Sequence, residues 1–89
     1  MYTYKASRLF WHKFHALPID QKEAARRAWR IFRVDPFDPR LGTHRIHRLS
    51  ALQKRTVYSI VITGNLRAVF YIDGDTVFTF DLGTHAIYR

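Results

Sequence analysis

Residues 56–82 read TVYSIVITGNLRAVFYIDGDTVFTFDL, and this stretch decides the fold. Three runs of β-branched and aromatic residues, at 56–63, 66–72 and 76–82, are typical of strands. Gly64-Asn65 separates the first two runs and Asp73-Gly74-Asp75 the last two, and these residue types favour tight hairpin turns. The stretch therefore predicts a three-stranded antiparallel meander.

Alternation along these strands predicts which side chains share a face of the sheet. With two-residue turns, Arg67 would lie on the same face as Ile60 and Phe78. Asp81 would then lie on the opposite face with Ala68. Both faces carry apolar residues, so the pattern leaves open which of them meets the helices, and a β-bulge would reverse part of the assignment.

The residues before the meander predict one strand and two helices. Residues 2–6 are β-prone, and Ser7 is a good cap for a helix that runs to Pro18. Asp20 and Glu23 resemble the capping box of a second helix. Its buried face would hold Ala25, Ala28, Trp29 and Phe32.

A loop at 35–39 and a further strand at about 44–49 complete the predicted order. The two helices would form an αα-hairpin, and the whole order is β-α-α-β-β-β-β. We therefore expect an α+β fold in a single domain over residues 1–89, with both helices on one face of the sheet.

Composition narrows the class of protein. The chain has 89 residues, of which 47% are hydrophobic and 16% aromatic, as expected for a globular domain. Its net charge of +8 favours a polyanionic partner. The absence of cysteine excludes disulfides and thiolate metal sites. No apolar stretch approaches the roughly 20 residues of a membrane span, and no signal-peptide pattern is present, so we expect a soluble, cytoplasmic protein.

Several segments, taken in order, resemble the RelE/ParE superfamily of bacterial toxins. The strand–helix–helix–meander order is similar, and so are Phe14-His15-Ala16-Leu17-Pro18, Asp35-Pro36-Phe37-Asp38-Pro39, Asn65-Leu66-Arg67-Ala68-Val69-Phe70 and Gly83-Thr84-His85-Ala86-Ile87-Tyr88. The resemblance spans nearly the whole chain. It implies the toxin of a type II toxin–antitoxin pair, with the antitoxin protein as partner. RelE-like members cleave mRNA in the A site of the 70S ribosome and so inhibit translation, whereas ParE-like members inhibit DNA gyrase.

The resemblance also implies site residues. Arg67 matches the strand arginine that contacts phosphate in the family. His85 matches the catalytic histidine of YafQ-like members, and Tyr88 matches a terminal aromatic residue that orients a base in several RelE-like members. Two features depart from the pattern. Asp81 stands where YafQ-like members carry an arginine, and the lysine pair of RelE has only Lys54-Arg55 as its nearest counterpart.

These residue types suit RNA cleavage without a metal. The 2′-hydroxyl attacks the adjacent phosphorus, so a site must move two protons and neutralise the phosphorane. His85 can carry one proton near neutral pH, and Arg67 can hold two phosphate oxygens. The second proton carrier would be His44 or His47, of which a strand would direct at most one to the site. The remaining residues of the predicted RNA-binding surface are Arg45, Arg48, Lys54, Arg55 and Arg89.

Histidine pairs at His12/His15 and His44/His47 raise the possibility of a metal site. A site needs three or four ligands, and no carboxylate stands at a convincing spacing from either pair. We therefore expect no metal and no cofactor.

The second predicted helix is strongly basic. Arg26, Arg27, Arg30 and Arg33 could track RNA phosphates or receive an acidic segment of the antitoxin. Three functions stay open at this point. A ribosome-dependent mRNA endoribonuclease is favoured, and the alternatives are a ParE-like gyrase inhibitor and a catalytically silent relative that binds RNA or antitoxin.

Overall fold

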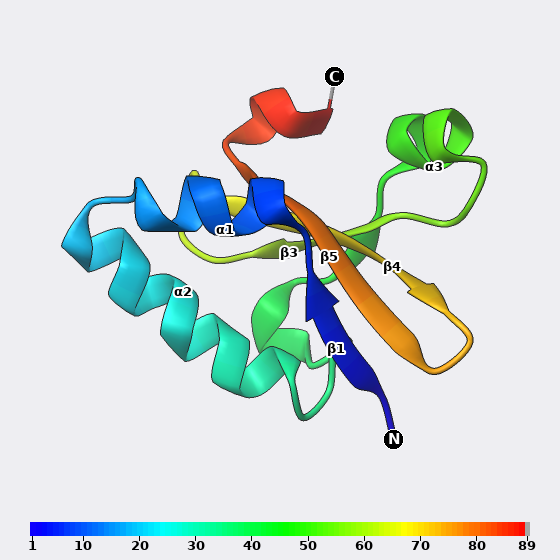
Figure 1. The fold of residues 1–89 in the computed structure, drawn as a ribbon, viewed down its shortest axis with the longest axis horizontal. Helices are drawn as coiled ribbons and strands as arrows, with labels where there is room; N and C mark the ends of the chain where they lie inside the picture. Colours follow the sequence, from blue (N-terminus) through cyan, green and yellow to red (C-terminus); the bar gives the residue numbers. More distant parts are fainter. Residues whose placement is uncertain (89) are drawn as a thin grey trace.

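The computed structural model describes residues 1–88 as three α-helices, five strands and two short 3₁₀ helices (Figure 1). In chain order they are β1 (Thr3–Ala6), α1 (Arg8–His15), α2 (Ile19–Phe32), η1 (Pro39–Leu41), β2 (His44–Arg45), α3 (His47–Gln53), β3 (Tyr58–Val61), β4 (Arg67–Asp73), β5 (Thr76–Gly83) and η2 (His85–Tyr88). The predicted α+β class, the N-terminal strand, the helix pair and the meander are confirmed.

The five strands form one mixed sheet in the order β1-β5-β4-β3-β2. The meander β3-β4-β5 is antiparallel, and β2 adds to it antiparallel. β1 pairs in parallel with β5, so the first and last strands of the chain lie side by side (Figure 1). The central strands β5, β4 and β3 therefore have a strand on each side.

Ser7 begins α1 as predicted. Its hydroxyl accepts a hydrogen bond from the Phe10 amide at 3.0 Å and donates one to the Phe80 carbonyl at 2.9 Å. The predicted capping box of α2 is wrong. α2 begins at Ile19 after Pro18, and no side chain caps it. Because proline fixes φ near the helical value, the chain enters the helix there without a capping side chain.

The predicted two-residue turn between β3 and β4 is also wrong. β3 ends at Val61, and residues 62–66 connect it to β4, with the Ile62 amide 2.9 Å from the Leu66 carbonyl. Leu66 is buried in the core, which draws the longer connection inward. Ile60 consequently pairs with Ala68, on the face opposite to Arg67.

A β-bulge changes the predicted face of Asp81. The register between β4 and β5 shifts between Val69 and Phe70, so Val69 pairs with Asp81 and Phe70 with Thr79. Without the bulge, Asp81 would have lain on the face of Ala68. The bulge instead pairs Asp81 with Val69, while Thr79 stays opposite Phe70 on the face that α1 and α2 cover.

The strand predicted at about 44–49 is only two residues long, and α3 follows it. Ile46 and Leu49 have helical spacing, and both pack in a cluster on the second face of the sheet. Ser50 fixes α3, because its hydroxyl donates to the Ile46 carbonyl and accepts from the Val57 amide, both at 2.8 Å. Helices therefore cover both faces of the sheet, not one as predicted.

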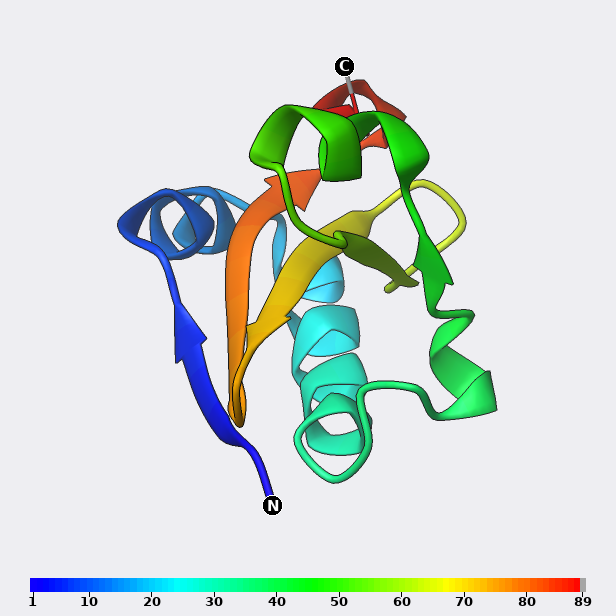
Figure 2. The same cartoon turned by 90° about the vertical axis from the view of Figure 1, so that its right-hand side faces the viewer.

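Two apolar clusters hold the layers together. The larger lies between the sheet and the pair α1 and α2, and includes Phe10, Phe14, Phe32, Phe70 and Leu82. The smaller lies between the other face and α3 with η2. Figure 2 shows that α3 and η2 both lie at the end of the molecule away from the N-terminus. No helix within residues 1–88 is long and apolar enough to cross a membrane.

Candidate functional site

The smaller apolar cluster brings the C-terminal turn and the basic segment 44–55 to the same face of the sheet. Leu49, Val57 and Val69 are its buried residues, and the partly buried residues packed on them are Ile46, Phe80, Ile87 and Tyr88. Leu49 comes from α3, whereas Ile87 and Tyr88 come from η2. The predicted catalytic tail and most of the predicted RNA-binding residues are therefore anchored to one cluster.

His85 and Tyr88 lie together in η2. Their rings stack with centroids 5.4 Å apart and an interplanar angle of 27°. His85 is exposed, while the Tyr88 hydroxyl forms a hydrogen bond with the hydroxyl of fully buried Ser59 on β3. The tyrosine is thus held by the sheet, and the imidazole rests on it with one side open to solvent.

Gly83 permits the close approach of η2 to the end of β5. A Cβ atom at this position would lie 2.7 Å from Cγ2 of Ile87, which is shorter than a van der Waals contact. Since Ile87 packs in the smaller cluster, a side chain at 83 would push the turn that carries His85.

Arg67 begins β4 beside this turn, paired with Gly83. Its guanidinium donates to the carbonyl groups of the 62–66 connection. Nη1 lies 2.7 Å from the Thr63 oxygen and 3.2 Å from the Leu66 oxygen, and Nη2 lies 3.2 Å from the Gly64 oxygen. Neither of the two ion pairs formed within residues 1–88 includes Arg67, so its charge is not neutralised there.

Asp81 is paired with a cation from α1. Its Oδ1 lies 2.6 Å from the Lys13 Nζ, and the same oxygen accepts from the Leu82 amide at 2.8 Å. The carboxylate is half-buried. Asp81 therefore does not present an unpaired negative charge to a phosphate bound near His85.

The predicted RNA-binding residues other than Arg89 all lie exposed between β2 and β3. His44 and Arg45 form β2, His47 and Arg48 begin α3, and Lys54 and Arg55 follow it. Arg89 lies outside the described residues.

Three residues of this basic segment have a defined contact or backbone conformation. The Nδ1 of His44 lies 3.0 Å from the Gly42 carbonyl, and Lys54 adopts a left-handed backbone with φ of 55°. The Arg55 guanidinium lies over the Tyr71 ring at 4.2 Å, a cation–π contact. His47 belongs to a helix, so the strand argument that placed His44 and His47 on opposite faces does not apply.

Within residues 1–88, no three histidine or carboxylate side chains lie close enough together to share a metal ion.

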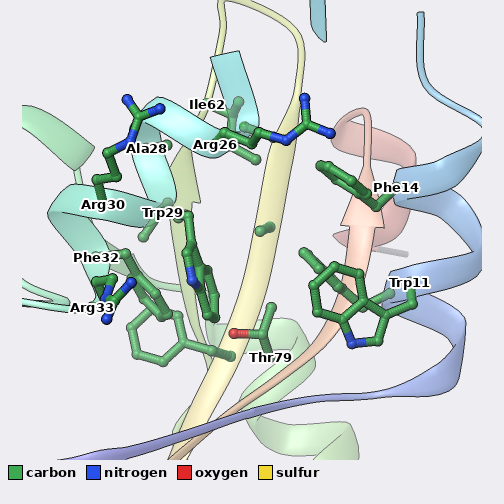
Figure 3. A pocket seen from close by; sticks show the side chains of 15 residues that line it. Trp11, Phe14, Arg26, Ala28, Trp29, Arg30, Phe32, Arg33, Ile62 and Thr79 are labelled. Carbon is green, nitrogen blue, oxygen red and sulfur yellow. The ribbon is translucent and has the colours of Figure 1, made fainter. Parts of the chain in front are cut away.

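The four arginines of α2 divide between two surfaces. Arg26, Arg30 and Arg33 line a groove of about 440 Å³ between α1, α2 and the sheet (Figure 3). Arg27 instead lies at a smaller hollow beside Arg40. The groove belongs to the face that α1 and α2 cover, so it is on the other side of the sheet from the smaller cluster.

The groove is apolar apart from its arginines and one hydroxyl. Trp11 and Trp29 stand on opposite sides of it, and Thr79 lies on its floor (Figure 3). Thr79 is 2% exposed, and its Oγ1 has no hydrogen-bond partner within residues 1–88. Burial removes the hydrogen bonds that this hydroxyl would form with water, and no group within residues 1–88 replaces them.

Comparison with known proteins shows a likeness of fold. Neither a protein-family model nor a curated protein sequence matches this chain. RelE in the RelE–RelB complex of Pyrococcus horikoshii superposes with a TM-score of 0.71, at 11% identity over 93% of each chain. The chain has a RelE-like fold.

Two further solved structures share the RelE-like fold. A copper-bound mutant toxin from Helicobacter pylori has a TM-score of 0.64 at 16% identity over 98% of each chain. YafQ from Escherichia coli has a TM-score of 0.63 at 9% identity, over 98% of this chain and 97% of YafQ. At these identities the RelE-like fold is what the chains share.

Sequence reasoning missed three residues of this chain. Ser59 supports Tyr88, Lys13 neutralises Asp81, and Thr79 lies unpaired in the groove. A polar residue inside a strand of apolar neighbours was the available signal for Ser59 and Thr79. Nothing in the sequence links Lys13 to Asp81, which stand 68 residues apart.

Proposed function

We propose that this chain is the toxin of a type II toxin–antitoxin system and cleaves mRNA on the ribosome. The observation that carries the proposal is the joint position of His85, Tyr88 and Arg67 beside an exposed basic segment, on a RelE-like fold. In RNA cleavage by its own 2′-hydroxyl, an imidazole can carry one of the two protons that must move, a guanidinium can neutralise charge on the phosphorane, and an aromatic ring can orient a base. The second proton carrier would be His44 or His47 of the basic segment.

Each residue has a role in this proposal. His85 exchanges a proton at the scissile phosphate, because its imidazole is exposed and imidazole can act as a general acid or base. Tyr88 supports the imidazole and orients the neighbouring base. Arg67 holds non-bridging oxygens of the phosphate, exchanging some carbonyl contacts for a charge-assisted bidentate contact.

The basic segment supplies the binding surface for mRNA and ribosomal RNA. Its exposed cations lie on the α3 side of the sheet, where they share a face with η2. Neutralising phosphates releases counterions, so we expect binding to weaken steeply with salt. In this proposal the chain is a single domain that acts in the cytoplasm without a cofactor, and an antitoxin protein neutralises it.

The test is primer extension on a reporter mRNA in a purified translation system. Wild-type protein is expected to create new 5′ ends within codons only when ribosomes are present. His85→Ala is expected to abolish these ends, and His12→Ala, an exposed histidine on α1, is the matched control that leaves them unchanged.

Different outcomes separate the alternatives. Cleavage that persists in both His85→Ala and Arg67→Ala would refute the assigned chemistry. An intact message with translation blocked would mean ribosome binding without cleavage. An intact message with normal translation and inhibited gyrase supercoiling would replace the proposal with a ParE-like function.

A further inference from the structure

Two aromatic side chains stand together on the face of the sheet opposite to α1 and α2. Tyr71 on β4 pairs directly with Phe78 on β5, so both side chains project from the same face. Their rings stack with centroids 5.4 Å apart and an interplanar angle of 24°. Both residues are half-buried, and neither is among the residues of the two apolar clusters. The pair is therefore a partly exposed aromatic surface beside the core.

This aromatic pair is continuous with the candidate site. The Phe80 ring lies 5.7 Å from the Tyr71 ring, and Phe80 also packs in the smaller cluster together with Tyr88. The hairpin of β4 and β5 extends away from α3 and η2, toward the end of the molecule that carries the N-terminus (Figure 2). At about 3.3 Å per residue, Tyr71 stands about 13 Å along β4 from Arg67. The pair thus shares a face with the candidate site but is separate from it.

A cation stands on each side of the aromatic pair. The guanidinium of Arg55, which follows α3, lies over the Tyr71 ring at 4.2 Å. Lys5 on β1 pairs with Phe78, so its side chain projects from the same face at the other end of the row. Both cations are exposed, and neither takes part in the two ion pairs formed within residues 1–88. This charge favours an anionic occupant.

The flat rings between the cations favour an unpaired nucleobase. Aromatic side chains stack on the face of a base, and single-stranded RNA exposes these faces whereas a duplex covers them. An acidic peptide would use the two cations but not the rings. Asp73 and Asp75 are exposed where β4 turns into β5, and their carboxylates repel phosphate. The strand therefore lies across the row and does not continue over the turn.

We propose that Tyr71 and Phe78 form a second RNA subsite, which stacks on one unpaired base. Arg55 exchanges part of its contact with Tyr71 for a phosphate on one side of that base, and Lys5 contacts a phosphate on the other side. Naming the strand as the mRNA substrate rests on the proposed function, whereas the stacking of an unpaired base does not. Because larger rings stack more strongly, the subsite favours adenine over uracil.

The probe is a fluorescein-labelled 2′-O-methyl oligoadenosine, titrated against the full chain by fluorescence anisotropy. The methyl group blocks the attacking hydroxyl, so the proposed cleavage does not enter the measurement. A 2′-O-methyl oligouridine of the same length measures the preference for a base. A self-complementary RNA hairpin of the same length measures binding when the bases are paired.

Ring variants test the stacking. Tyr71→Leu keeps an apolar side chain without the ring, so it should weaken oligoadenosine binding by about tenfold and reduce the preference for adenine. Tyr71→Phe keeps the ring and should bind within about twofold of the wild type. Tyr2→Leu is the matched control, because the exposed Tyr2 ring contacts Tyr4, which packs on the opposite face. This control should leave binding unchanged.

Cation variants test the phosphate contacts. Arg55→Gln and Lys5→Gln should each reduce the slope of log K against log salt concentration by about 0.7, equally for both oligonucleotides. The ring variants should leave that slope unchanged, because they remove no charge. Phe78→Leu repeats the ring test at the second position, so the result does not depend on the stability of Tyr71→Leu. Urea unfolding of each variant shows that it is folded before it is titrated.

Other results would overturn the inference. Unchanged binding in both Tyr71→Leu and Phe78→Leu, an equal loss in Tyr2→Leu, or equal affinity for the paired hairpin would each refute it. Tighter binding of oligodeoxyadenosine with the same dependence on Tyr71 would assign the face to single-stranded DNA. Displacement of the probe by polyglutamate with the same dependence would assign it to an acidic protein.

Cleavage of the reporter mRNA on the ribosome is measured separately. A chain that stacks adenine through Tyr71 but leaves the message intact would refute the proposed function and support this subsite. A chain that cleaves the message but binds both oligonucleotides equally well in the wild type and in the ring variants would do the reverse. The two failures are therefore distinguishable.

Discussion

Thr79→Val is expected to stabilise the free protein. The hydroxyl at this position is 2% exposed and unpaired within residues 1–88, and valine replaces it with a methyl group of similar size. A buried polar group without a partner costs about 1–3 kcal/mol, so its removal should raise the free energy of unfolding by an amount in that range. For a chain of this size, each kcal/mol corresponds to a rise in Tm of about 4–8 °C.

The assay is urea unfolding followed by tryptophan fluorescence. A higher midpoint with an unchanged m value is the expected signature, because the extent of exposed surface does not change. Ser59→Ala is the matched control, since it removes a buried hydroxyl that does have a partner, Tyr88, and should lower stability by about 1 kcal/mol. Thr79→Val at or below wild-type stability would show that the hydroxyl is satisfied in the folded protein.

Two further predictions concern the C-terminal turn and the loop before β2. Gly83→Ala should displace η2 and lower the proposed RNA cleavage, because the new Cβ meets Ile87 at 2.7 Å. The double variant with Ile87→Ala should recover part of this activity, and full activity in the single variant would contradict the tight approach. The side chain and backbone amide of Arg40 lower the pKa of the Asp38 carboxyl by hydrogen bonding, so its NMR titration should fall below the ordinary aspartate range. Since the folded pKa is depressed, whatever stability this contact gives is present above the ordinary pKa and is lost as pH falls through the lowered value. Arg40→Ala should raise the titration midpoint, and a midpoint that stays unchanged would refute this cause.

Local patterns predicted most of the fold. The Ser7 cap, the apolar stripe of α2 and the three β-rich runs each depend on residues close together in the chain, and these predictions are confirmed. The errors arose where a contact distant in sequence decides the conformation. Leu66 is drawn into the core, which lengthens the turn between β3 and β4, and Leu49 packs on the second face, which makes α3 a helix.

In the candidate site, too, local sequence predicted some features and could not predict others. Neighbours in the sequence, such as His85 and Tyr88, could be placed together before the structure was known. The charge state around them could not, because Lys13 reaches Asp81 from the opposite end of the chain. Helical spacing alone sets Arg27 apart from Arg26, Arg30 and Arg33, but it does not show which of these faces lines the larger groove.

The parallel pairing of β1 with β5 has a consequence for synthesis. Thr3 pairs with Thr76 and Ala6 with Thr79, so the first strand finds its place only after nearly all the chain has been made. At about 5–20 residues per second, the emerging N-terminal half waits several seconds with its aromatic helices uncovered. Contacts of this sequence separation also slow folding after release. The interval gives a chaperone or a co-translationally supplied partner its opportunity to bind before the sheet closes.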